Sequence, residues 1–418
     1  MTIFKTASIY VLSNIINAAI PFLLLPVITK YLSQEEYGQA AMFQSLVLGL
    51  AAFVGLNIQG FSIRKYFDKN DVINTEYLAN SNGACFLVLI FTTIITSIFL
   101  GIFNKEISNL LSIPSEWINI AVLTSATSFI VQLRLGQWQV RNDAIKYGLL
   151  LITQSSLYMG LSLIFIISMK LGSEGRILGQ FYSTLIFSII SIGYLYKDKL
   201  LKLDNIKYSM LKEIIFYGIP LIPHTFGFFI IYTSDRIILN KYLGLSSVGI
   251  YVLAVQVSSV VTILCDSINK AYMPWLFSKL KLNNKNVNLS IVKSTYYYFL
   301  FLIFMSFLSF LIGPYIISFI APTYIEASHI IGYLCLGQAI SSMYTTISNY
   351  LFYTKNTGVI STITIISGIL NAILMAIMIY YSGLFGAALA FCISKLIQLI
   401  MVWYISNKYY PMPWFIYR

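Results

Sequence analysis

The sequence predicts an all-α polytopic membrane protein, with twelve transmembrane helices in two six-helix lobes related by a pseudo-two-fold axis along the membrane normal. Hydrophobic residues occupy 58% of the 418 positions and charged residues only 10%, whereas soluble domains carry about 25% charged residues. Apolar runs long enough to cross roughly 30 Å of hydrocarbon as a helix recur along the whole chain. A repeat with a fixed offset divides these runs into two sets of six.

The apolar runs define the elements in order. The first run is too long for a signal peptide and lacks a small-residue cleavage site, so we expect a retained first span. Helices are the expected form because they satisfy their own backbone groups in lipid. We place the spans at about 8–29, 37–63, 83–103, 117–138, 147–169, 177–196, 214–239, 248–272, 295–320, 328–353, 358–381 and 384–405.

The basic residues predict the orientation of these spans. With both termini in the cytoplasm, 19 Lys and Arg residues fall on the cytoplasmic side and 5 on the opposite side. Cytoplasmic loops of membrane proteins carry an excess of basic residues, so we expect cytoplasmic termini. The net charge of +12 is thereby explained by topology, and we expect no nucleic-acid partner.

An internal repeat predicts the division into lobes. Lys30-Tyr31-Leu32 matches Lys241-Tyr242-Leu243, and Gly172 and Gly175 match Gly383 and Gly386, always at an offset of 211 residues. Six spans per half give the halves the same orientation, as in transporters built from parallel repeats. We expect one lobe in residues 1–200 and the other in residues 201–418.

Four stretches of the sequence carry a family resemblance. They are S-x-Y-V-L-S-N-I-I-N…P-x-x-T-K-Y-L-S-Q-E-E-Y-G at the start, Y-G-I-P-L-I-P-H…S-D-R-I-I-L-N-K-Y-L-G-L-S-S-V-G-I-Y at the seventh span, N-x-x-Y-M-P-W-L-F (269–277) and N-Y-L-F-Y-T-K-N-T (349–357). Their order and spacing resemble those of Wzx-type O-antigen and polysaccharide flippases, within the multidrug/oligosaccharidyl-lipid/polysaccharide exporter superfamily.

The resemblance implies a function in the bacterial inner membrane. Such a protein carries an undecaprenyl-pyrophosphate-linked oligosaccharide, the repeat unit of an O-antigen or capsule, from the cytoplasmic to the periplasmic leaflet by alternating access. The resemblance also implies coupling to H⁺ or Na⁺, no cofactor and no covalent chemistry, so we expect no enzyme activity. Besides membrane lipid, a polysaccharide polymerase and a chain-length regulator are the implied protein partners.

A pyrophosphate in apolar surroundings needs cations, and the arginine fork suits phosphate because it donates two hydrogen bonds at once. Charge inside a span is costly and usually functional. The alternatives are a structural ion pair, or anchoring of long basic side chains at the membrane surface. The candidate substrate-binding residues, all basic and within or beside spans, are Arg64, Arg134, Arg141, Arg236, Lys355 and Lys395.

Two acidic residues within spans are candidates for ion coupling. Asp235 lies beside Arg236 in the seventh span, and Asp266 lies in the eighth. Asp235 has the alternative of pairing with its neighbour, and Asp266 that of pairing with Lys270, one helical turn away. We expect no metal site, because the chain has two histidines and four scattered cysteines.

Two other functions compete with the flippase. A drug or cation antiporter of the same superfamily shares the twelve spans, but the charges inside these spans are mostly basic, which favours an anionic substrate. A membrane-embedded glycan polymerase or ligase needs a large extracytoplasmic loop, and the longest one expected is near 104–116. The sequence has no G-x-x-x-x-G-K-[ST] loop to bind a nucleotide.

Overall fold

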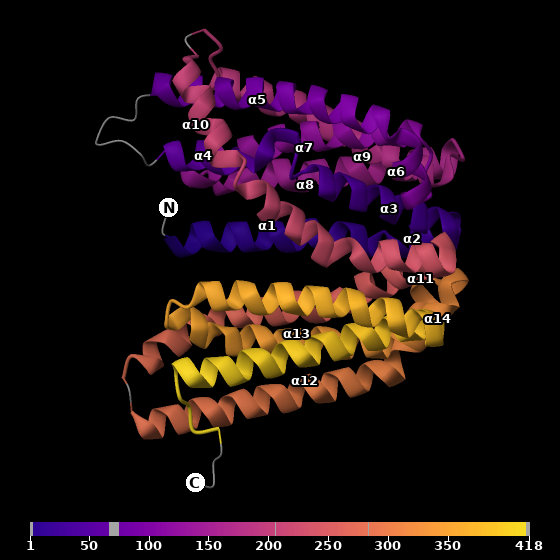
Figure 1. The fold of residues 1–418 in the computed structure, drawn as a ribbon, viewed down its shortest axis with the longest axis vertical. Helices are drawn as coiled ribbons and strands as arrows, with labels where there is room; N and C mark the ends of the chain where they lie inside the picture. The colour runs from indigo at the N-terminus through magenta and orange to yellow at the C-terminus, as the bar shows by residue number, and fades with distance from the viewer. Residues whose placement is uncertain (1–2, 67–74, 205, 283, 415–418) are drawn as a thin grey trace. The chain divides into compact units, whose positions relative to one another are not determined.

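The computed structural model describes residues 3–66, 75–204, 206–282 and 284–414. All regular elements in these ranges are helical, which confirms the predicted all-α class (Figure 1). Contacts divide the chain into two compact units, Met1–Thr233 and Ser234–Arg418, whereas the sequence placed the division at 200/201. Nine helices in the described ranges are long and apolar enough to cross a membrane, or ten if the bent pair Gln34–Leu50 and Val54–Lys65 is one span.

Unit 1 contains the helices of the first half of the chain. They are α1 (Ile3–Leu23), α2 (Leu25–Tyr31), α3 (Gln34–Leu50), η1 (Val54–Asn57), α4 (Gln59–Lys65), α5 (Thr75–Ile102), α6 (Asn104–Leu111), α7 (Glu116–Val140), α8 (Ala144–Leu163), η2 (Ile164–Ser168), α9 (Gly172–Lys197), α10 (Tyr208–Gly218) and the beginning of α11 (Leu221–Leu280). The most enclosed span is α7, with 56% of its apolar window buried against 17% for α1–α2. Helices α3, α4, α5, α8 and α9 all pack on α7.

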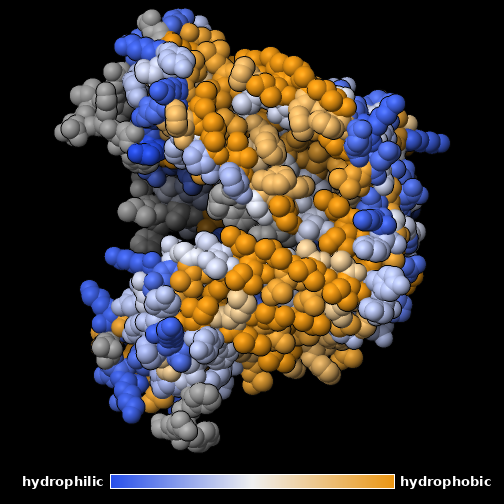
Figure 2. Space-filling view, in the orientation of Figure 1, coloured by the Kyte–Doolittle hydropathy of each residue, from blue (hydrophilic) through white to orange (hydrophobic). Residues whose placement is uncertain are grey.

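Unit 2 contains the rest of α11, followed by α12 (Lys285–Ile320), η3 (Pro322–Ala327), α13 (Ser328–Tyr353) and α14 (Thr357–Tyr409). Its central span is η3–α13, in which 67% of the apolar window is buried, against 22% for α12 and for α14. Both α12 and α14 pack on α13. In each unit, apolar side chains cover the middle of the helices and hydrophilic ones gather at their ends (Figure 2), as expected for spans in a bilayer.

Specific residues fix the helix ends and breaks. Ser33 begins α3 with a capping box, in which its hydroxyl accepts from the Glu36 N–H and the Glu36 carboxylate accepts from the Ser33 N–H. Between α3 and α4 the backbone turns by 67° where Gly55, Leu56 and Asn57 all have positive φ. These left-handed residues cannot continue an α-helix, so the predicted single span 37–63 is bent.

The repeated glycines lie at matching structural positions. Gly172, at the start of α9, has φ 54°, and Gly383, which breaks α14, has φ 56°. Lys30-Tyr31-Leu32 ends α2, and Lys241-Tyr242-Leu243 precedes Gly244, where φ of 79° and ψ of 176° break α11. Glycine tolerates these backbone angles, which strain residues with a Cβ. The offset of 211 residues therefore relates junctions of the same kind in the two units.

Candidate functional site

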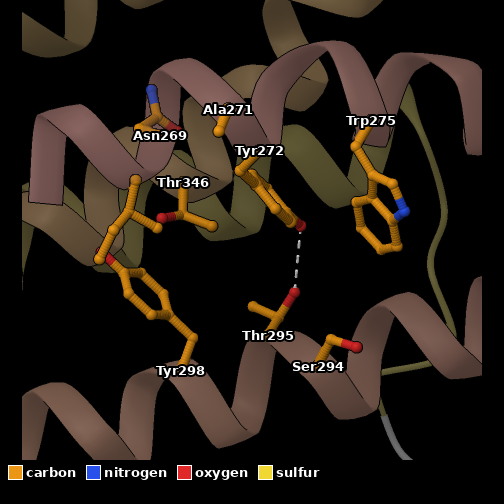
Figure 3. Close-up of a pocket in the computed structure, with 9 residues that line it drawn as sticks. Asn269, Ala271, Tyr272, Trp275, Ser294, Thr295, Tyr298 and Thr346 are labelled. Carbon is orange, nitrogen blue, oxygen red and sulfur yellow. Dashed lines mark hydrogen bonds between the residues drawn. The ribbon is translucent and has the colours of Figure 1, made fainter.

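A pocket of about 520 Å³ lies wholly within unit 2, between α11, α12 and α13. Its volume falls in the range of about 300–1,000 Å³ that is common for small-molecule sites. In Figure 3, α11 and α12 form two facing walls, and the Tyr272 and Tyr298 rings extend from them into the space between. The lining residues are Ile268, Asn269, Ala271, Tyr272, Trp275, Ser294, Thr295, Tyr298 and Thr346.

Helical spacing brings these side chains together. On α11, Ile268, Tyr272 and Trp275 follow one another at steps of four and three residues, which places them on one face of the helix. On α12, Ser294 and Tyr298 are four residues apart. Pro274 lies within α11 and has no N–H to donate to the carbonyl oxygen one turn earlier. The aromatic wall is therefore carried by a helix that lacks one backbone hydrogen bond.

Two contacts between helices hold the pocket walls in place. The hydroxyls of Tyr272 on α11 and Thr295 on α12 are 3.4 Å apart. The Asn349 Nδ2 on α13 donates to the Asn269 Oδ1 on α11 at 2.8 Å. The second bond orients the Asn269 amide, whose own Nδ2 makes no hydrogen bond within the described residues. The three helices of the pocket are thus tied together by these two contacts.

The chemistry of the pocket is neutral. Its walls are aromatic rings, hydroxyls and one amide, and none of the lining residues carries a charge. The hydroxyls of Ser294 and Thr346 each donate to the carbonyl one turn earlier, at 3.0 Å. The Ser294 hydroxyl is exposed and keeps acceptor capacity, whereas Thr346 is only 3% exposed. This surface can receive O–H donors and stack flat apolar faces, and it offers no counter-charge to a phosphate.

Unit 1 holds its buried cation differently. The Arg134 side chain on α7 is 0% exposed and forms an ion pair with Asp198, which follows α9. Its guanidinium carbon lies 4.2 Å from the centroid of the Trp138 ring and 5.9 Å from that of Tyr194. The Nε and Nη1 groups have no hydrogen-bond partner within the described residues. The contacts of the guanidinium are thus mainly structural, and two of its three nitrogen atoms keep N–H groups without a partner in the described part of the chain.

Neutral polar side chains reinforce the same region of unit 1. Gln137 on α7 donates to the Ser62 Oγ on α4 at 2.6 Å. Ser62 donates to the Asn82 Oδ1 on α5, and the Asn82 Nδ2 donates to the Leu200 carbonyl at 2.7 Å. Buried polar groups are costly unless they are paired. This chain of bonds fixes α4, α5 and α7 around the Arg134 environment.

The other candidates in unit 1 lie at helix ends. Arg64 is exposed in the last turn of α4. Arg141 follows α7, half-buried, with its guanidinium 5.8 Å from the Tyr66 ring centroid. Arg141 is also close enough to Arg134 to act on it electrostatically. The structure therefore brings Arg134, within α7, and Arg141, at the end of α7, near each other.

The candidates in unit 2 lie on separate helices or at their ends. Asp235 and Arg236 are half-buried on α11, and the Asp235 carboxylate accepts the Arg236 backbone N–H at 2.8 Å. Asp266 is exposed on α11, and no ion pair joins it to Lys270 within the described ranges.

The two lysine candidates of unit 2 are also apart from one another. Lys355 is exposed in the turn after α13, where its φ is 62°. Lys395 on α14 is half-buried and reaches the Gln398 Oε1 at 3.4 Å. No hydrogen bond or ion pair in the described part of the chain links Lys355, Lys395 and Asp266 to one another.

Sequence reasoning did not single out the aromatic residues of the pocket. Tyr272 and Trp275 lie inside the 269–277 stretch that carried part of the resemblance, but Tyr298 carries no such mark. The chain has 31 tyrosines and 29 phenylalanines, and many large apolar side chains face outwards on α12. Only the packing of α11 against α12 distinguishes the rings that face a pocket from those that do not.

Comparison with known proteins agrees with this architecture. The family described as "Polysaccharide biosynthesis protein" matches residues 3–281. "Lsg locus putative protein 1" of Haemophilus influenzae is 25% identical over 406 residues, covering 93% of this chain and 96% of the relative. An "Uncharacterized membrane protein" of the same organism is 25% identical over 416 residues, covering 93% and 95%.

Solved structures share the fold. The lipid II flippase MurJ in an inward closed conformation has a TM-score of 0.76 at 18% identity, covering 95% of this chain and 87% of that one. An inward-facing MATE multidrug transporter of the MOP superfamily has a TM-score of 0.62 at 16% identity, covering 94% and 97%. Together with the family match, these findings confirm the resemblance seen in the sequence, and the chain belongs to the polysaccharide biosynthesis protein family.

Proposed function

We propose that the protein is a flippase that carries an undecaprenyl-pyrophosphate-linked oligosaccharide from the cytoplasmic to the periplasmic leaflet of a bacterial inner membrane. The observation that carries the proposal is the family match over residues 3–281. The fold shared with a lipid II flippase supports it. The substrate is an O-antigen or capsule repeat unit, and a polysaccharide polymerase and a chain-length regulator act with the protein.

Twelve spans in two six-helix lobes are part of this proposal. Helices α11 and α14 contain 60 and 53 residues, which at about 1.5 Å per residue is far longer than a bilayer is thick. Gly244 and Gly383 interrupt these two helices and leave, on each side of the break, a stretch long enough to cross a bilayer. If α11 and α14 each count as two spans, and the bent pair of α3 and α4 counts as one, the total is twelve. The even count and the excess of basic residues on one side support the proposal that both termini are cytoplasmic.

The basic candidates bind the pyrophosphate in this mechanism. Arg64 and Arg141, at the ends of α4 and α7, are accessible enough to meet a phosphate first. Arg236 and Lys395 lie within spans, where a cation stabilises an anion more strongly than in water. Arg134 contributes only through the donors that Asp198 leaves unused. Lys355, exposed after α13, completes the set.

Alternating access in this mechanism is coupled to H⁺ or Na⁺. Asp235 is half-buried within a span beside a cation, which suits a carboxylate that exchanges a proton or a cation with substrate charge. Asp266 is exposed on α11 and is the second coupling group. Transport requires no covalent step, so none of these residues acts as a nucleophile.

Deletion of the gene followed by lipid extraction tests the proposal. We expect undecaprenyl-pyrophosphate oligosaccharide to accumulate on the cytoplasmic leaflet and surface glycan to disappear. Unchanged lipid pools together with altered efflux of cationic dyes would instead indicate a drug antiporter; the similar MATE proteins are named multidrug resistance transporters.

Charge reversal at one residue tests the phosphate-binding role. Arg236→Glu should abolish surface glycan while the protein remains inserted in the membrane at its normal level. Lys241→Glu, which changes an exposed lysine on the same helix, is the matched control and should display glycan normally. Normal display by a well-expressed Arg236→Glu variant would remove Arg236 from the site.

A further inference from the structure

We propose that the pocket between α11, α12 and α13 is a subsite for an uncharged sugar ring, in which the pyranose stacks on Tyr272, Trp275 and Tyr298. The inference deepens the proposed flippase function and rests on it for the source of the sugar. It concerns a site that none of the basic candidates lines. The residues that carry it are the aromatic and hydroxyl groups of the pocket walls.

The aromatic rings fit the faces of a sugar. Tyr272 and Trp275 are adjacent on α11, with ring centroids 5.5 Å apart and planes inclined by 37°. Tyr298 extends from the facing wall (Figure 3). The faces of aromatic rings carry partial negative charge, and the C–H groups on one face of a pyranose carry partial positive charge. A sugar between the two walls therefore meets complementary surfaces on both sides.

The polar groups fit the rim of the same ring. The Ser294 hydroxyl is exposed and donates to the Ser290 carbonyl at 3.0 Å, which leaves its oxygen as an acceptor for a sugar O–H group. Thr295 and Thr346 are only 1% and 3% exposed, so they shape the wall of the pocket without offering a hydroxyl to the sugar. Tyr272 and Tyr298 add phenolic hydroxyls among the lining side chains. Sugar hydroxyls are both donors and acceptors, so both kinds of group can be satisfied.

Other ligand chemistries fit less well. A phosphate would lie among rings and hydroxyls with no basic residue in the lining, and burial of an unpaired charge is strongly unfavourable. An alkyl chain would cover the exposed Ser294 hydroxyl and the phenolic hydroxyls of the lining without offering the hydrogen bonds that water makes to them, which also carries a cost. A neutral polyol with apolar faces is the chemistry that uses both the aromatic rings and the accessible hydroxyls of the lining.

The proposal has a direct binding test. The full chain in lipid nanodiscs is probed by saturation-transfer NMR with methyl β-D-glucoside and methyl β-D-N-acetylglucosaminide. Methyl phosphate and 1-butanol serve as probes of phosphate and alkyl binding. Saturation of aromatic protein protons should pass to the C–H protons on one face of a glycoside and to neither of the other probes.

Variants assign the signal to the pocket. Trp275→Ala and Tyr298→Ala should each weaken glycoside binding by about two- to tenfold, the factor expected for loss of one aromatic contact. Trp275→Phe keeps a ring and should retain most of the signal. The matched control is Tyr297→Ala, because Tyr297 is the neighbour of Tyr298 on α12, is 73% exposed and is absent from the lining. This control should bind as the unmodified protein does.

The outcomes separate this inference from the flippase proposal. Glycoside signals that are equal in all variants, or pocket-dependent signals from methyl phosphate or butanol, would overturn the sugar subsite. If Trp275→Ala and Tyr298→Ala lose binding as expected, the subsite stands even where gene deletion leaves lipid-linked pools unchanged. In that case only the proposed substrate lipid and its transport would be wrong.

Discussion

The two units differ in the polar groups that their helices enclose. Unit 1 encloses a full cation, Arg134, and ties it to Asp198 and to the Trp138 ring. Unit 2 leaves neutral hydroxyls, rings and an amide around an open pocket. A charged residue inside a span is therefore not by itself the place where a ligand binds. In unit 1 the buried charge mainly stabilises the fold, whereas in unit 2 the surface of the pocket is uncharged.

Loss of the buried cation should produce the largest effect on stability. Removing one member of a buried pair costs about 3–5 kcal/mol, but Asp198 is 30% exposed and can regain water. We therefore expect Arg134→Ala to lower the free energy of unfolding by about 2–3 kcal/mol. Chemical unfolding of the purified protein in detergent, followed by tryptophan fluorescence or circular dichroism, measures this loss.

Two further variants define the cause. Arg134→Lys keeps the charge but not the planar fork, so it should lower the free energy of unfolding, but by less than Arg134→Ala does. Lys146→Ala removes an ion pair with Asp143 whose side chains are 54% and 41% exposed, and such pairs contribute about 0–1 kcal/mol. An Arg134→Ala variant no less stable than Lys146→Ala would contradict a structural role for the guanidinium.

The repeated glycines should give a smaller effect that is shared by both units. Gly172 and Gly383 have φ of 54° and 56°, so Gly172→Ala and Gly383→Ala should each cost about 1–2 kcal/mol in unfolding free energy through backbone strain. At Gly172 the added Cβ would also displace the Glu36 side chain, whereas at Gly383 it meets no atom within 4 Å, so the cost at Gly172 should be the larger. The matched control is Gly358→Ala in α14, where an added Cβ meets no atom within 4 Å. Alanine there should be neutral or stabilising, because it favours the helix. Costs at only one of the two repeat positions would break the structural correspondence.

Much of the fold followed from local signals in the sequence. The paired glycines and the long apolar runs each report on their own segment, so the structure has helices where most of the predicted spans lie. The bend at 54–57 was not predicted. Leu56 and Asn57 have positive φ there, although neither residue type demands it, and hydropathy reports the length of a span but not its direction.

The candidate sites were less predictable because they depend on how helices pack, which local signals in the sequence do not report. Charged residues within apolar runs are conspicuous, so Arg134 was selected as a candidate. Its partner Asp198 is 64 residues away, and their pairing depends on the packing of α7 and α9. The pocket depends on which faces of α11 and α12 meet. Tyr297 and Tyr298 are neighbours in sequence, yet only Tyr298 lines the pocket. Single-sequence patterns do not carry that information.

The hydroxyl contact across the pocket should give the smallest effect. The oxygen atoms of Tyr272 and Thr295 are 3.4 Å apart, at the long end of hydrogen-bond distances, and the Thr295 hydroxyl already donates to the Ile291 carbonyl at 2.9 Å. Tyr272→Phe therefore leaves the Thr295 hydroxyl with its own acceptor and should cost about 0.5 kcal/mol in unfolding free energy. Tyr297→Phe, on the exposed neighbour of Tyr298, is the control for loss of a phenolic hydroxyl. A Tyr272→Phe cost above that of Gly383→Ala would mean that unit 2, like unit 1, depends on its buried polar contacts for stability, and the contrast between the units would then fail.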